Sequence, residues 1–369
     1  MNKPYIEAIS TTVGTIVGGG ILALPYAVSK VGFIYGLLLF AVIGFASVMV
    51  TMYTGELSSR FKKLHQLPVI VGRYTSERFK VLVLLFQLLT IYGAQVAYLT
   101  GMGLVLVFIL KINYLLSVSI VFILTLPLIY KGYRNVESAE TPLLFIKIIF
   151  IVLISIIAFS MFKPSNIYGS GGGALFGSFG IILFSLTGYT VIPEIKQEID
   201  GDIPRLKKTI IYSYLISITI YIVFSAAFFG AFGQNVSQIA TASLSTGYYS
   251  IVAAITTLFL LITPYIALSL VITDSLNLDF GISRGKSTIA ALLFPFAVAM
   301  FALNFDVVLE LTGGIFLSIL SILVLLAVYN ARVSDKNKPA LLVRGGNYML
   351  LITGAIMSLG LIYTLAQVI

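Results

Sequence analysis

The sequence predicts an all-α membrane protein whose helices cross the bilayer many times. Its 369 residues are 59% hydrophobic and only 10% charged, with a mean hydropathy of +1.05. Apolar runs of about 20 residues, the length needed to cross about 30 Å of hydrocarbon, recur along the whole chain. A composition with so few charged side chains is typical of a chain whose solvent is the bilayer.

Eleven transmembrane spans are predicted in order, within a single transmembrane domain that covers residues 1–369. The loops between them are short, and the longest polar one runs from Ser59 to Glu77. No cleavable signal peptide is expected, because only Met1 to Lys3 precede the first span. The approximate bounds of the spans are 4–29, 33–58, 80–110, 113–130, 141–162, 173–196, 208–232, 247–275, 287–303, 306–330 and 346–366.

The basic residues of the loops predict the orientation, because cytoplasmic loops carry an excess of lysine and arginine. If the N-terminus is cytoplasmic, nineteen basic residues lie inside and three lie outside. A cell-membrane protein with a cytoplasmic N-terminus and an extracellular C-terminus is therefore expected. The inside set is Lys3, Arg60, Lys62, Lys63, Arg73, Arg78, Lys80, Lys131, Arg134, Lys196, Arg205, Lys207, Lys208, Arg284, Lys286, Arg332, Lys336, Lys338 and Arg344, and the outside set is Lys30, Lys111 and Lys163.

The composition also excludes several kinds of chemistry. The absence of cysteine excludes disulfides and thiolate metal sites, and the single histidine, His65, falls in a basic polar loop. An intramembrane enzyme would need a nucleophile–base pair or metal ligands within the spans, and the sequence has no cysteine, intramembrane histidine or HExxH run. The net charge of +9 follows from the basic cytoplasmic loops, so no nucleic-acid partner is expected.

The first span contains a predicted helix break. Gly18, Gly19 and Gly20 are consecutive near its middle, and each costs roughly 1 kcal/mol relative to alanine in a helix interior. Broken backbone at membrane depth is tolerated where it is buried in protein or lines a cavity. The amides of the three glycines would form the N-terminal end of a second half-helix, which suits an amino-acid carboxylate. Close packing of helices through small residues is the alternative.

The sixth span contains a second predicted break, and its position indicates an internal repeat. In the first span Pro25 follows Gly20 by five residues, and in the sixth Pro193 follows Gly188 by five, an offset of 168. Five spans per half require the second half to be inverted, and paired interruptions point to a transporter's binding site. Ser185 and Thr187 can stabilise an opened turn by local hydrogen bonds. A Gly/Ser kink without a ligand is the alternative.

The two breaks and their surroundings supply the predicted substrate-binding residues. Freed carbonyls at the second break would suit an ammonium group, and Tyr189 would wall the pocket. Polar residues of the third span add two candidates, and Thr263, Ser269 and Thr273 of the eighth span are further possible lining residues, although such residues often only bond neighbouring helices. The predicted set is Thr15, Ile16, Val17, Gly18, Gly19, Gly20, Phe184, Ser185, Leu186, Thr187, Tyr189, Tyr92 and Gln95.

Lys147 lies inside the fifth span, about two turns from its cytoplasmic end. An ionisable residue within a span is a functional-site hypothesis by default. A buried lysine can gain and lose a proton near neutrality, which predicts a proton-coupling role. The alternative is that its long stem extends to the interface, only about 10 Å away at 1.5 Å per residue.

Five carboxylates lie near the ends of spans. Glu56, Glu194 and Asp274 are at cytoplasmic ends, whereas Asp306 and Glu310 share one helix face at the outer end of the tenth span. Solvated or capping roles are expected for Glu56 and Asp306. Glu310 is one turn deeper and is a candidate for an outer gate or a second proton site. Glu194 and Asp274 are the other gating candidates.

The stretch from Gly14 to Pro25, Gly-Thr-Ile-Val-Gly-Gly-Gly-Ile-Leu-Ala-Leu-Pro, resembles the first-helix signature of the amino acid–polyamine–organocation (APC) superfamily. It is most similar to the aromatic and hydroxy amino acid permease and the amino acid/auxin permease branches, which eleven spans also suit. Phe184 to Glu194, and the loop from Ile199 to Pro204 with its two following lysines, resemble the sixth helix of that superfamily and its cytoplasmic loop. The resemblance covers spans one to ten.

This resemblance implies the LeuT-type fold: two inverted five-helix repeats, approximately 4–162 and 172–330, with broken first and sixth helices and an extra helix at 346–366. It implies that the substrate α-carboxylate binds the first break and that the α-amino group binds both breaks. Proton-coupled members carry a fifth-helix lysine, which Lys147 matches in span and depth. Sodium-coupled relatives place hydroxyl ligands in the eighth span, so Ser269 and Thr273 keep Na⁺ open as the coupling ion.

The leading prediction is therefore a secondary transporter that imports a neutral hydrophobic or aromatic amino acid with H⁺ by alternating access. The apolar neighbours of the breaks, Ile16, Val17, Ile21 and Phe184, favour an apolar side chain. A sodium symporter, an amino acid exchanger and a transporter-like receptor are the alternatives. The expected partners are the amino acid and the lipid bilayer, with no cofactor, metal or required protein partner.

Overall fold

In the computed structural model, the residues described are 3–132, 136–168, 177–244, 249–278, 281–302, 304–334, 343 and 347–368, and all their regular structure is helical. Four residues counted in the predicted topology, Arg134, Lys336, Lys338 and Arg344, lie outside these ranges. The first half contains α1 (Lys3–Ile16), η1 (Gly19–Ala23), α2 (Leu24–Val31), α3 (Phe33–Ser58), α4 (Leu67–Tyr74), α5 (Glu77–Leu110), α6 (Tyr114–Lys131), α7 (Val136–Phe159) and α8 (Pro164–Tyr168).

The second half follows the same plan with more interruptions. A π-helix, η5, joins α14 to α15 within one span, and among the described residues of the chain four short 3₁₀ helices mark breaks and loops. The elements are α9 (Phe179–Ser185), η2 (Tyr189–Val191), α10 (Ile192–Glu198), α11 (Ile203–Phe232), η3 (Gly233–Asn235), η4 (Ala240–Leu244), α12 (Tyr249–Leu278), α13 (Arg284–Ala299), α14 (Phe305–Leu311), η5 (Thr312–Leu317), α15 (Ser318–Ser334) and α16 (Tyr348–Val368).

Helical segments occupy all eleven predicted spans, but not all are long enough to cross a bilayer unaided. Within the described residues, nine helices meet the length and hydropathy expected of a span, and the bent pair α1–α2 makes a tenth. The ninth predicted span, 287–303, is α13, which has 16 residues and ends at Ala299. At 1.5 Å per residue it is about 24 Å long, less than the hydrocarbon thickness.

The long loop predicted after the second span is partly helical. α4 forms within it because Leu67, Ile70 and Val71 are buried, at no more than 1% exposure, and Pro68 occupies the first turn of the helix, where its missing N–H costs nothing. The polar residues around this apolar run obscure it in the sequence. α4 packs against α5 and α15, so it covers one end of the helix bundle.

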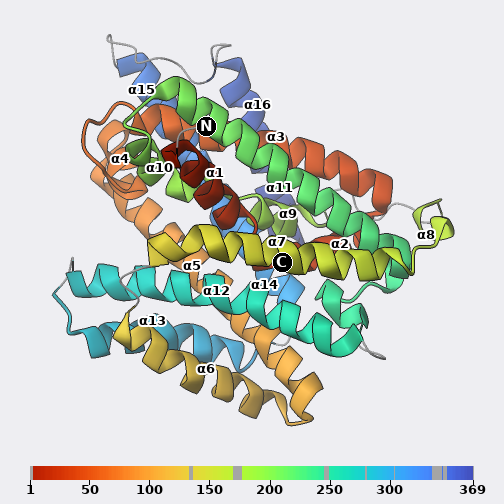
Figure 1. Cartoon of the computed structure of the whole chain (residues 1–369). Helices are drawn as coiled ribbons and strands as arrows, with labels where there is room; N and C mark the ends of the chain where they lie inside the picture. Colours follow the sequence, from red (N-terminus) through yellow and green to blue (C-terminus); the bar gives the residue numbers. More distant parts are fainter. Residues whose placement is uncertain are drawn as a thin grey trace.

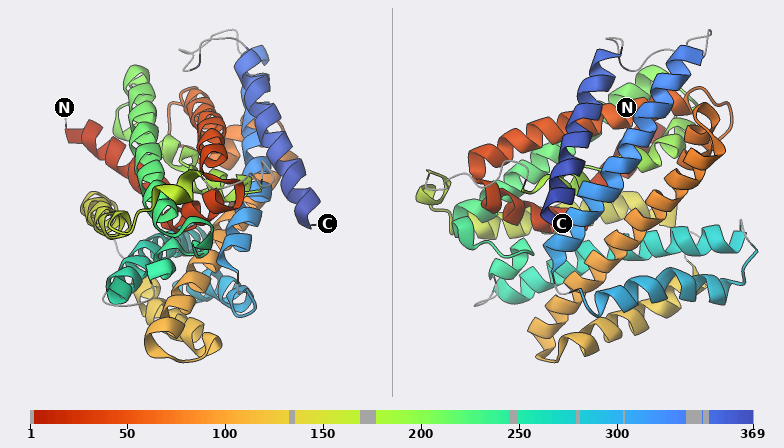
Figure 2. Two further views of the ribbon diagram at one scale, coloured as in Figure 1. Left: turned by 90° about the vertical axis from the view of Figure 1, so that its right-hand side faces the viewer. Right: turned by 180° about the vertical axis from the view of Figure 1, so that it is seen from behind.

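The helices form two groups that meet at the first break. α5, α6, α12 and α13 pack against one another, and α1–α2, α3, α9–α10 and α11 form the other group. In Figure 1, α6, α12 and α13 lie together in the lower part of the molecule while α1, α3 and α11 lie above them, and Figure 2 shows the same division from behind. η1 contacts both α9 and α12, so the break of the first span lies where the two groups meet.

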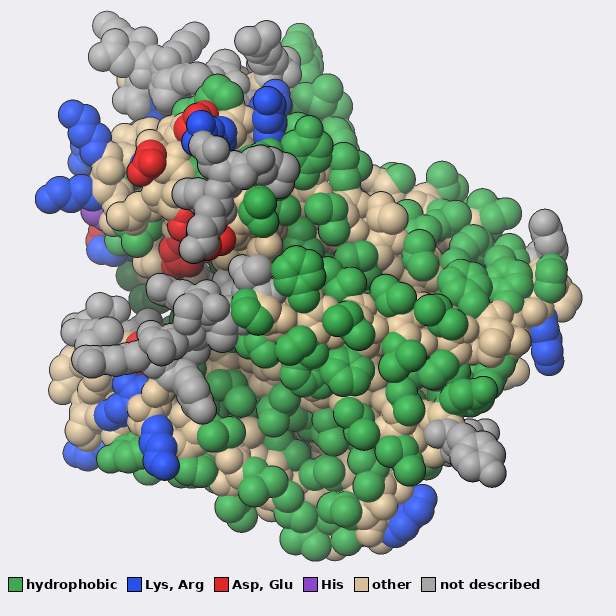
Figure 3. Space-filling model, viewed as in Figure 1, with side chains coloured by type: hydrophobic (Ala, Val, Ile, Leu, Met, Phe, Trp, Pro, Cys, Tyr) green, Lys and Arg blue, Asp and Glu red, His purple; other side chains and the backbone are tan. Residues whose placement is uncertain are grey.

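The outer surface is that of a protein surrounded by lipid. Large apolar side chains such as Ile123, Leu124 and Ile149 are more than 60% exposed, as lipid-facing side chains of spanning helices must be. In Figure 3 hydrophobic side chains cover the middle of the visible face. Lysine and arginine gather on its left side, where α4 and α10 lie in Figure 1, and only a few lie on its right.

Candidate functional site

The first break leaves two backbone amides ahead of a new helix. α1 ends at Ile16, Gly18 is extended (φ −110°, ψ −158°), and the two halves are bent by 42°. The Gly18 amide donates to the Ile16 carbonyl at 2.9 Å, and the first hydrogen bond of η1 runs from Ile21 to the Gly18 carbonyl at 3.4 Å. The amides of Gly19 and Gly20 precede that bond. The sequence predicts three amides at the N-terminal end of the second half-helix, but only those of Gly19 and Gly20 fill this role. The Gly18 amide is already hydrogen-bonded within the break.

The second break contains the local hydrogen bonds expected of its hydroxyl residues. α9 ends at Ser185, and the chain re-enters an α-helix at Ile192 after the single 3₁₀ turn of η2. The Ser185 and Thr187 hydroxyls donate to the Ile181 and Leu183 carbonyls, both at 2.8 Å. Side-chain bonds of this kind compensate backbone groups where a helix opens.

The three carbonyls expected to be free at the second break already accept hydrogen bonds. Thr187 donates its amide to the Phe184 carbonyl at 3.3 Å. The Ser185 and Leu186 carbonyls each accept a tyrosine hydroxyl from α11 at 2.9 Å. A carbonyl oxygen has two lone pairs, so an ammonium group here would use the second of each.

The two breaks touch each other through their glycines. A Cβ atom built on Gly20 would lie 2.6 Å from the Ser185 hydroxyl and 3.1 Å from its Cα, and one on Gly188 would lie 2.8 Å from the Ile16 side chain. Each break therefore packs a glycine against the last residue of the opposite half-helix. Only glycine permits this approach, because contacts under 3.0 Å force neighbouring atoms apart.

Tyr221 of α11 joins the two breaks through one hydroxyl. It donates toward the Ile16 and Ser185 carbonyls, which are the last carbonyls of α1 and α9. A tyrosine hydroxyl has one proton, so the two helix ends share a single donor. Sequence reasoning missed Tyr221. One sequence feature could have indicated it: Tyr214 lies seven residues earlier, on the same face of α11. Its hydroxyl donates to the Leu186 carbonyl, which directly follows Ser185.

Aromatic and aliphatic side chains from the other helix group close over the first break. A Cβ on Gly19 would lie 2.6 Å from both Tyr98 of α5 and Leu261 of α12. The Tyr98 ring meets the ring of Phe184 edge-on, with centroids 6.4 Å apart. Neither Tyr98 nor Leu261 belongs to the predicted set, because nothing in an apolar span marks which residue faces a break in another helix.

The predicted candidates of the third and eighth spans lie elsewhere. Tyr92 packs against Phe294 of α13 with the two rings tilted and their centroids 5.0 Å apart, and its hydroxyl donates to the Ala290 carbonyl at 3.4 Å. Gln95 donates to Ser269 of α12 at 2.7 Å, which ties the two helices together.

The eighth-span hydroxyls differ in what they contact. Ser269 accepts the Gln95 amide and donates to the Tyr265 carbonyl, and Thr263 bonds its own helix through the Phe259 carbonyl. Thr273 is fully buried, and its hydroxyl has no hydrogen-bond partner among the described residues. Of these three residues, only Thr273 has a hydroxyl without a hydrogen bond, and the hydroxyls of Thr256 and Tyr265 on the same helix are likewise buried without a partner among the described residues.

Lys147 is buried, at 8% exposure, on α7. α7 packs against α1, α11 and α12, so this helix is shared between the two groups. The burial places the lysine among other side chains and not at the lipid-facing surface, where neighbours such as Phe145 and Ile149 lie at about 60% exposure. A charged lysine in such surroundings needs a polar partner or loses its proton.

Two of the three gating candidates make surface contacts. Glu194 of α10 is exposed and accepts the Gln66 side-chain amide at 3.2 Å. Asp274, near the end of α12, pairs with Arg284 at the start of α13 at 2.9 Å, and Arg284 also donates to the Tyr130 carbonyl at 2.6 Å. These contacts tie loop ends on one side of the molecule. Such half-exposed pairs add little stability and can exchange readily.

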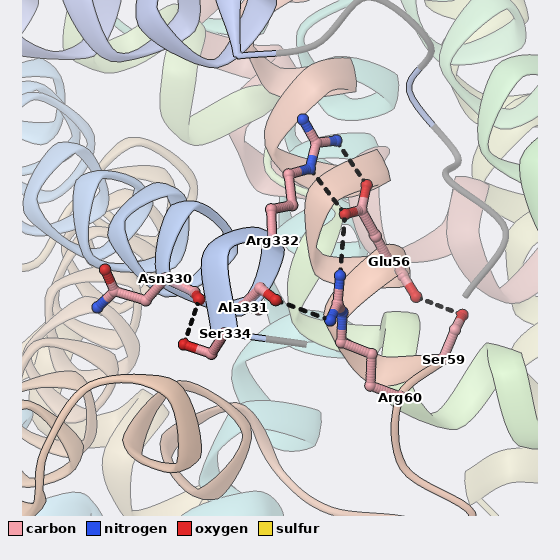
Figure 4. Close-up of polar contacts among 8 residues, drawn as sticks. Glu56, Ser59, Arg60, Asn330, Ala331, Arg332 and Ser334 are labelled. Carbon is pink, nitrogen blue, oxygen red and sulfur yellow. Dashed lines mark hydrogen bonds and ion pairs between the residues drawn. The ribbon is translucent and has the colours of Figure 1, made fainter. Parts of the chain in front are cut away.

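Glu56 does not have the solvated or capping role expected of it. It is fully buried on α3, and Figure 4 shows the guanidinium fork of Arg332 from α15 on its carboxylate, with N–O distances of 2.9 and 2.7 Å. Arg60 approaches the same carboxylate at 3.7 Å and donates to the Ala331 carbonyl at 3.0 Å. The sequence hides this pair because its members are 276 residues apart.

Asp306 is likewise buried and paired, contrary to the expected solvated or capping role. It is 4% exposed on α14, and Lys30 of α2 donates to it at 2.9 Å. Glu310, one turn further along α14, accepts the amides of Gly180 and Ile181 at 2.8 and 3.1 Å. Asp306 therefore connects α14 to α2, the half-helix that follows the first break. Glu310 connects α14 to α9, the half-helix that precedes the second break.

Comparison with known proteins identifies the family. Residues 1–367 match the Tryptophan/tyrosine permease family. The chain belongs to this family. The permease is 23% identical to "Tyrosine-specific transport system 1" of Haemophilus influenzae over 393 aligned residues, which cover 99% of this chain and 96% of the relative. The crystal structure of MhsT in complex with L-phenylalanine superimposes with a TM-score of 0.70 at 12% identity and covers 98% of both chains.

These matches confirm the predicted superfamily and the absence of an enzymatic role. A permease of this family transports amino acids across a membrane and is not an enzyme. The likeness of the whole chain to MhsT, which has a LeuT-type fold, shows an all-helical membrane protein with a similar overall fold. The permease thus places two broken helices in contact at the centre of a transporter fold.

Proposed function

We propose that the permease imports an aromatic amino acid by proton-coupled symport, with the substrate bound between the two helix breaks. The observation that carries the proposal is the meeting of the breaks at Gly20 and Ser185. The Gly19 and Gly20 amides are suited to the α-carboxylate, and the carbonyls at the second break are suited to the α-amino group. A transporter binds both groups of any amino acid in this way, so the side-chain contacts decide which substrate is carried.

The walls around the breaks support an aromatic substrate. Tyr98, Phe184 and Leu261 lie against the glycines of the first break, and Ile16 lies against Gly188 of the second. Aromatic rings prefer offset or edge-on partners, which Tyr98 and Phe184 can supply. The breaks are closed on each other here, with no room for one added methyl group at Gly19 or Gly20. Substrate entry therefore requires Tyr98 and Leu261 of the other helix group to move away from Gly19, and Ser185, in the same group as Gly20, to move away from Gly20.

The proposal includes two inverted repeats and a cytoplasmic N-terminus. In each half the first span is broken at a glycine five residues before a proline, namely Gly20 with Pro25 and Gly188 with Pro193. The repeats are those predicted, 4–162 and 172–330, with α16 as the additional helix. The clustering of basic side chains on one side of the apolar surface supports the orientation.

Proton coupling is proposed on the strength of Lys147. A buried lysine on a helix that contacts both groups can bind a proton in one conformation and release it in another. The protonated ammonium and the neutral amine differ by one charge in a low-dielectric interior. Conformations that solvate this position differently will therefore differ in proton affinity.

The test is uptake of labelled tyrosine, tryptophan and phenylalanine into proteoliposomes under an imposed inward proton gradient without sodium. Wild type, Lys147→Met and Lys163→Met would be compared, since methionine keeps an unbranched chain without the charge. We expect wild type and Lys163→Met to accumulate substrate and Lys147→Met to equilibrate it only. Wild-type uptake that ignores the gradient and requires sodium would refute proton coupling and direct attention to Thr273.

A sodium symporter is the alternative that one observation favours. The buried Thr273 hydroxyl has an unused lone pair in the span where sodium-coupled relatives supply hydroxyl ligands. Replacing external sodium by choline stops a sodium symporter and leaves a proton symporter or an exchanger unaffected. Loading the vesicles with unlabelled amino acid then stimulates an exchanger. Binding without any counterflow would indicate a receptor.

A further inference from the structure

Glu310 holds the start of α9 from a different span. Its two carboxylate oxygens accept the Gly180 and Ile181 amides, at 2.8 and 3.1 Å. Ser178 stands at the N-cap position of α9 but makes no capping bond, and its hydroxyl donates instead to the Ala27 carbonyl of α2 at 2.8 Å. The first amides of α9 therefore depend on Glu310 for hydrogen bonding, since a helix cannot satisfy them itself.

The backbone of α9 lies directly against the tenth span at this point. A Cβ on Gly180 would be 2.1 Å from the Glu310 carbonyl oxygen, and one on Gly313 would be 1.8 Å from the Gly180 carbonyl oxygen. No side chain separates the two backbones. Gly313 belongs to the π-helix η5, an irregularity that frequently marks functional positions. A change at the Glu310 carboxylate is therefore transmitted to α9 directly.

A cavity of about 320 Å³ gives this carboxylate access to solvent. Lys30, Asp306, Glu310, Leu311, Thr364 and Gln367 are among the residues that line it. Lys30 pairs with Asp306, whose second carboxylate oxygen is buried without a hydrogen-bond partner among the described residues. Among the described residues that line the cavity, these are the two charged groups beside Glu310, and neither α9 nor α16 carries a charged residue. One cation and two carboxylates leave the cluster with one net negative charge.

We propose that Glu310 is a proton-binding site and that its protonation releases α9 from the tenth span. A proton from water in the cavity would bond to one carboxylate oxygen and neutralise the cluster. Protonation removes the negative charge that strengthens both amide bonds and turns one oxygen into an O–H donor with less capacity to accept, so the bonds that hold α9 are weakened. Lys30 and Asp306 keep their own pair, and nothing else in the cluster needs to change its proton.

This site deepens the proposed function, on which it rests for the identity of the coupling ion. α9 has seven residues, so its two ends are about 10 Å apart. One end is held by Glu310, and the other is Ser185, which lies against Gly20 and whose carbonyl is held by Tyr221. Proton and substrate thus act on opposite ends of one short helix. Release of the first end frees the second to move away from Gly20.

The first experiment measures α9 release without any transport. The chain has no cysteine, so Leu311→Cys places a single thiol beside Glu310 on the cavity wall. Val307→Cys, on the same wall but 46% exposed, reports how thiol reactivity itself depends on pH. The ratio of their labelling rates by a membrane-impermeant maleimide should rise severalfold as the pH is lowered through the range where carboxylates titrate.

Two backgrounds identify the group that titrates. In Glu310→Gln, which keeps the shape but cannot accept both amides, the ratio should be high at every pH. In Asp306→Asn the rise with acidification should persist. A ratio that does not change with pH in wild type, or that changes equally in Glu310→Gln, overturns the proposal. Loss of the response in Asp306→Asn but not in Glu310→Gln assigns the proton to Asp306 and also overturns it.

Transport separates this proposal from the proposed function. Glu310→Gln should retain amino acid counterflow, which shows that it is folded, while the ratio of uptake with and without a proton gradient falls to about one. Undiminished proton-driven accumulation in this variant overturns the assignment of Glu310. If wild type itself shows no proton-driven uptake, the coupling in the proposed function fails, and the labelling experiment still decides whether Glu310 binds a proton that releases α9.

Discussion

Removal of the Glu56 carboxylate should destabilise the permease far more than removal of an exposed carboxylate. Glu56 is fully buried and carries the two charge-assisted bonds from Arg332. Breaking a buried pair by deleting one partner costs about 3–5 kcal/mol, because the remaining charge stays desolvated. Glu77 pairs with Lys80 at 2.6 Å, but the two side chains are 76% and 40% exposed. Such a pair contributes about 0.2–1 kcal/mol.

The comparison uses Glu56→Gln and Glu77→Gln, which remove the same charge from two ion-paired positions. The free energy of unfolding would be measured by denaturing detergent titration in mixed micelles. We expect the Glu56 variant to lose several times more stability than the Glu77 variant. Adding Arg332→Gln to Glu56→Gln should recover part of the loss, since it removes a buried unpaired charge. Equal losses in the two single variants would refute the argument from burial.

Three further substitutions test the contacts at and near the breaks. Gly19→Ala should cost about 1–3 kcal/mol through overpacking and reduce uptake, whereas Gly14→Ala, with no atom within 4 Å of its Cβ, should leave uptake unchanged. Tyr221→Phe removes the donor shared by the last carbonyls of α1 and α9, and should lower the free energy of unfolding by about 1–3 kcal/mol. Gly313→Ala places a methyl group 1.8 Å from the Gly180 carbonyl oxygen, and should reduce the yield of folded protein more than Gly19→Ala does.

Much of the fold follows from local features of the sequence. The apolar runs locate the spanning helices, since the bilayer accepts only segments that satisfy their own backbone. The two breaks are also local, because consecutive glycines and the Ser-Leu-Thr-Gly run oppose helix wherever they occur. α13 and α4 depart from the prediction for a different reason. The end of α13 and the burial of Leu67 depend on packing against neighbouring helices, and this packing cannot be predicted from the apolar runs of the sequence.

The candidate site shows the same limit more sharply. Gly20 and Gly188 are marked in the sequence by their own conformational freedom. Tyr98 and Tyr221 are ordinary tyrosines within long apolar helices, and only the packing of α5 and α11 brings them to the breaks. Tyr92 is also a tyrosine of the same apolar helix, six residues before Tyr98, yet it lies against α13. Six residues correspond to about 600° of helix turn, so these two side chains project in different directions.

The ion pairs of the tenth span indicate where the molecule can move. At one end Arg332 of α15 is bound to a fully buried carboxylate, and breaking that bond exposes charge to a medium that cannot solvate it. At the other end Asp306 and Glu310 of α14 bind their partners beside a solvent-accessible cavity, where water can replace a lost partner. The π-helix η5 lies between the two ends and interrupts the regular helix. We infer that α15 stays fixed to α3 while α14 and α9 separate, with η5 as the joint. Cross-linking α3 to α15 should then leave uptake intact, whereas cross-linking α14 to α9 should abolish it.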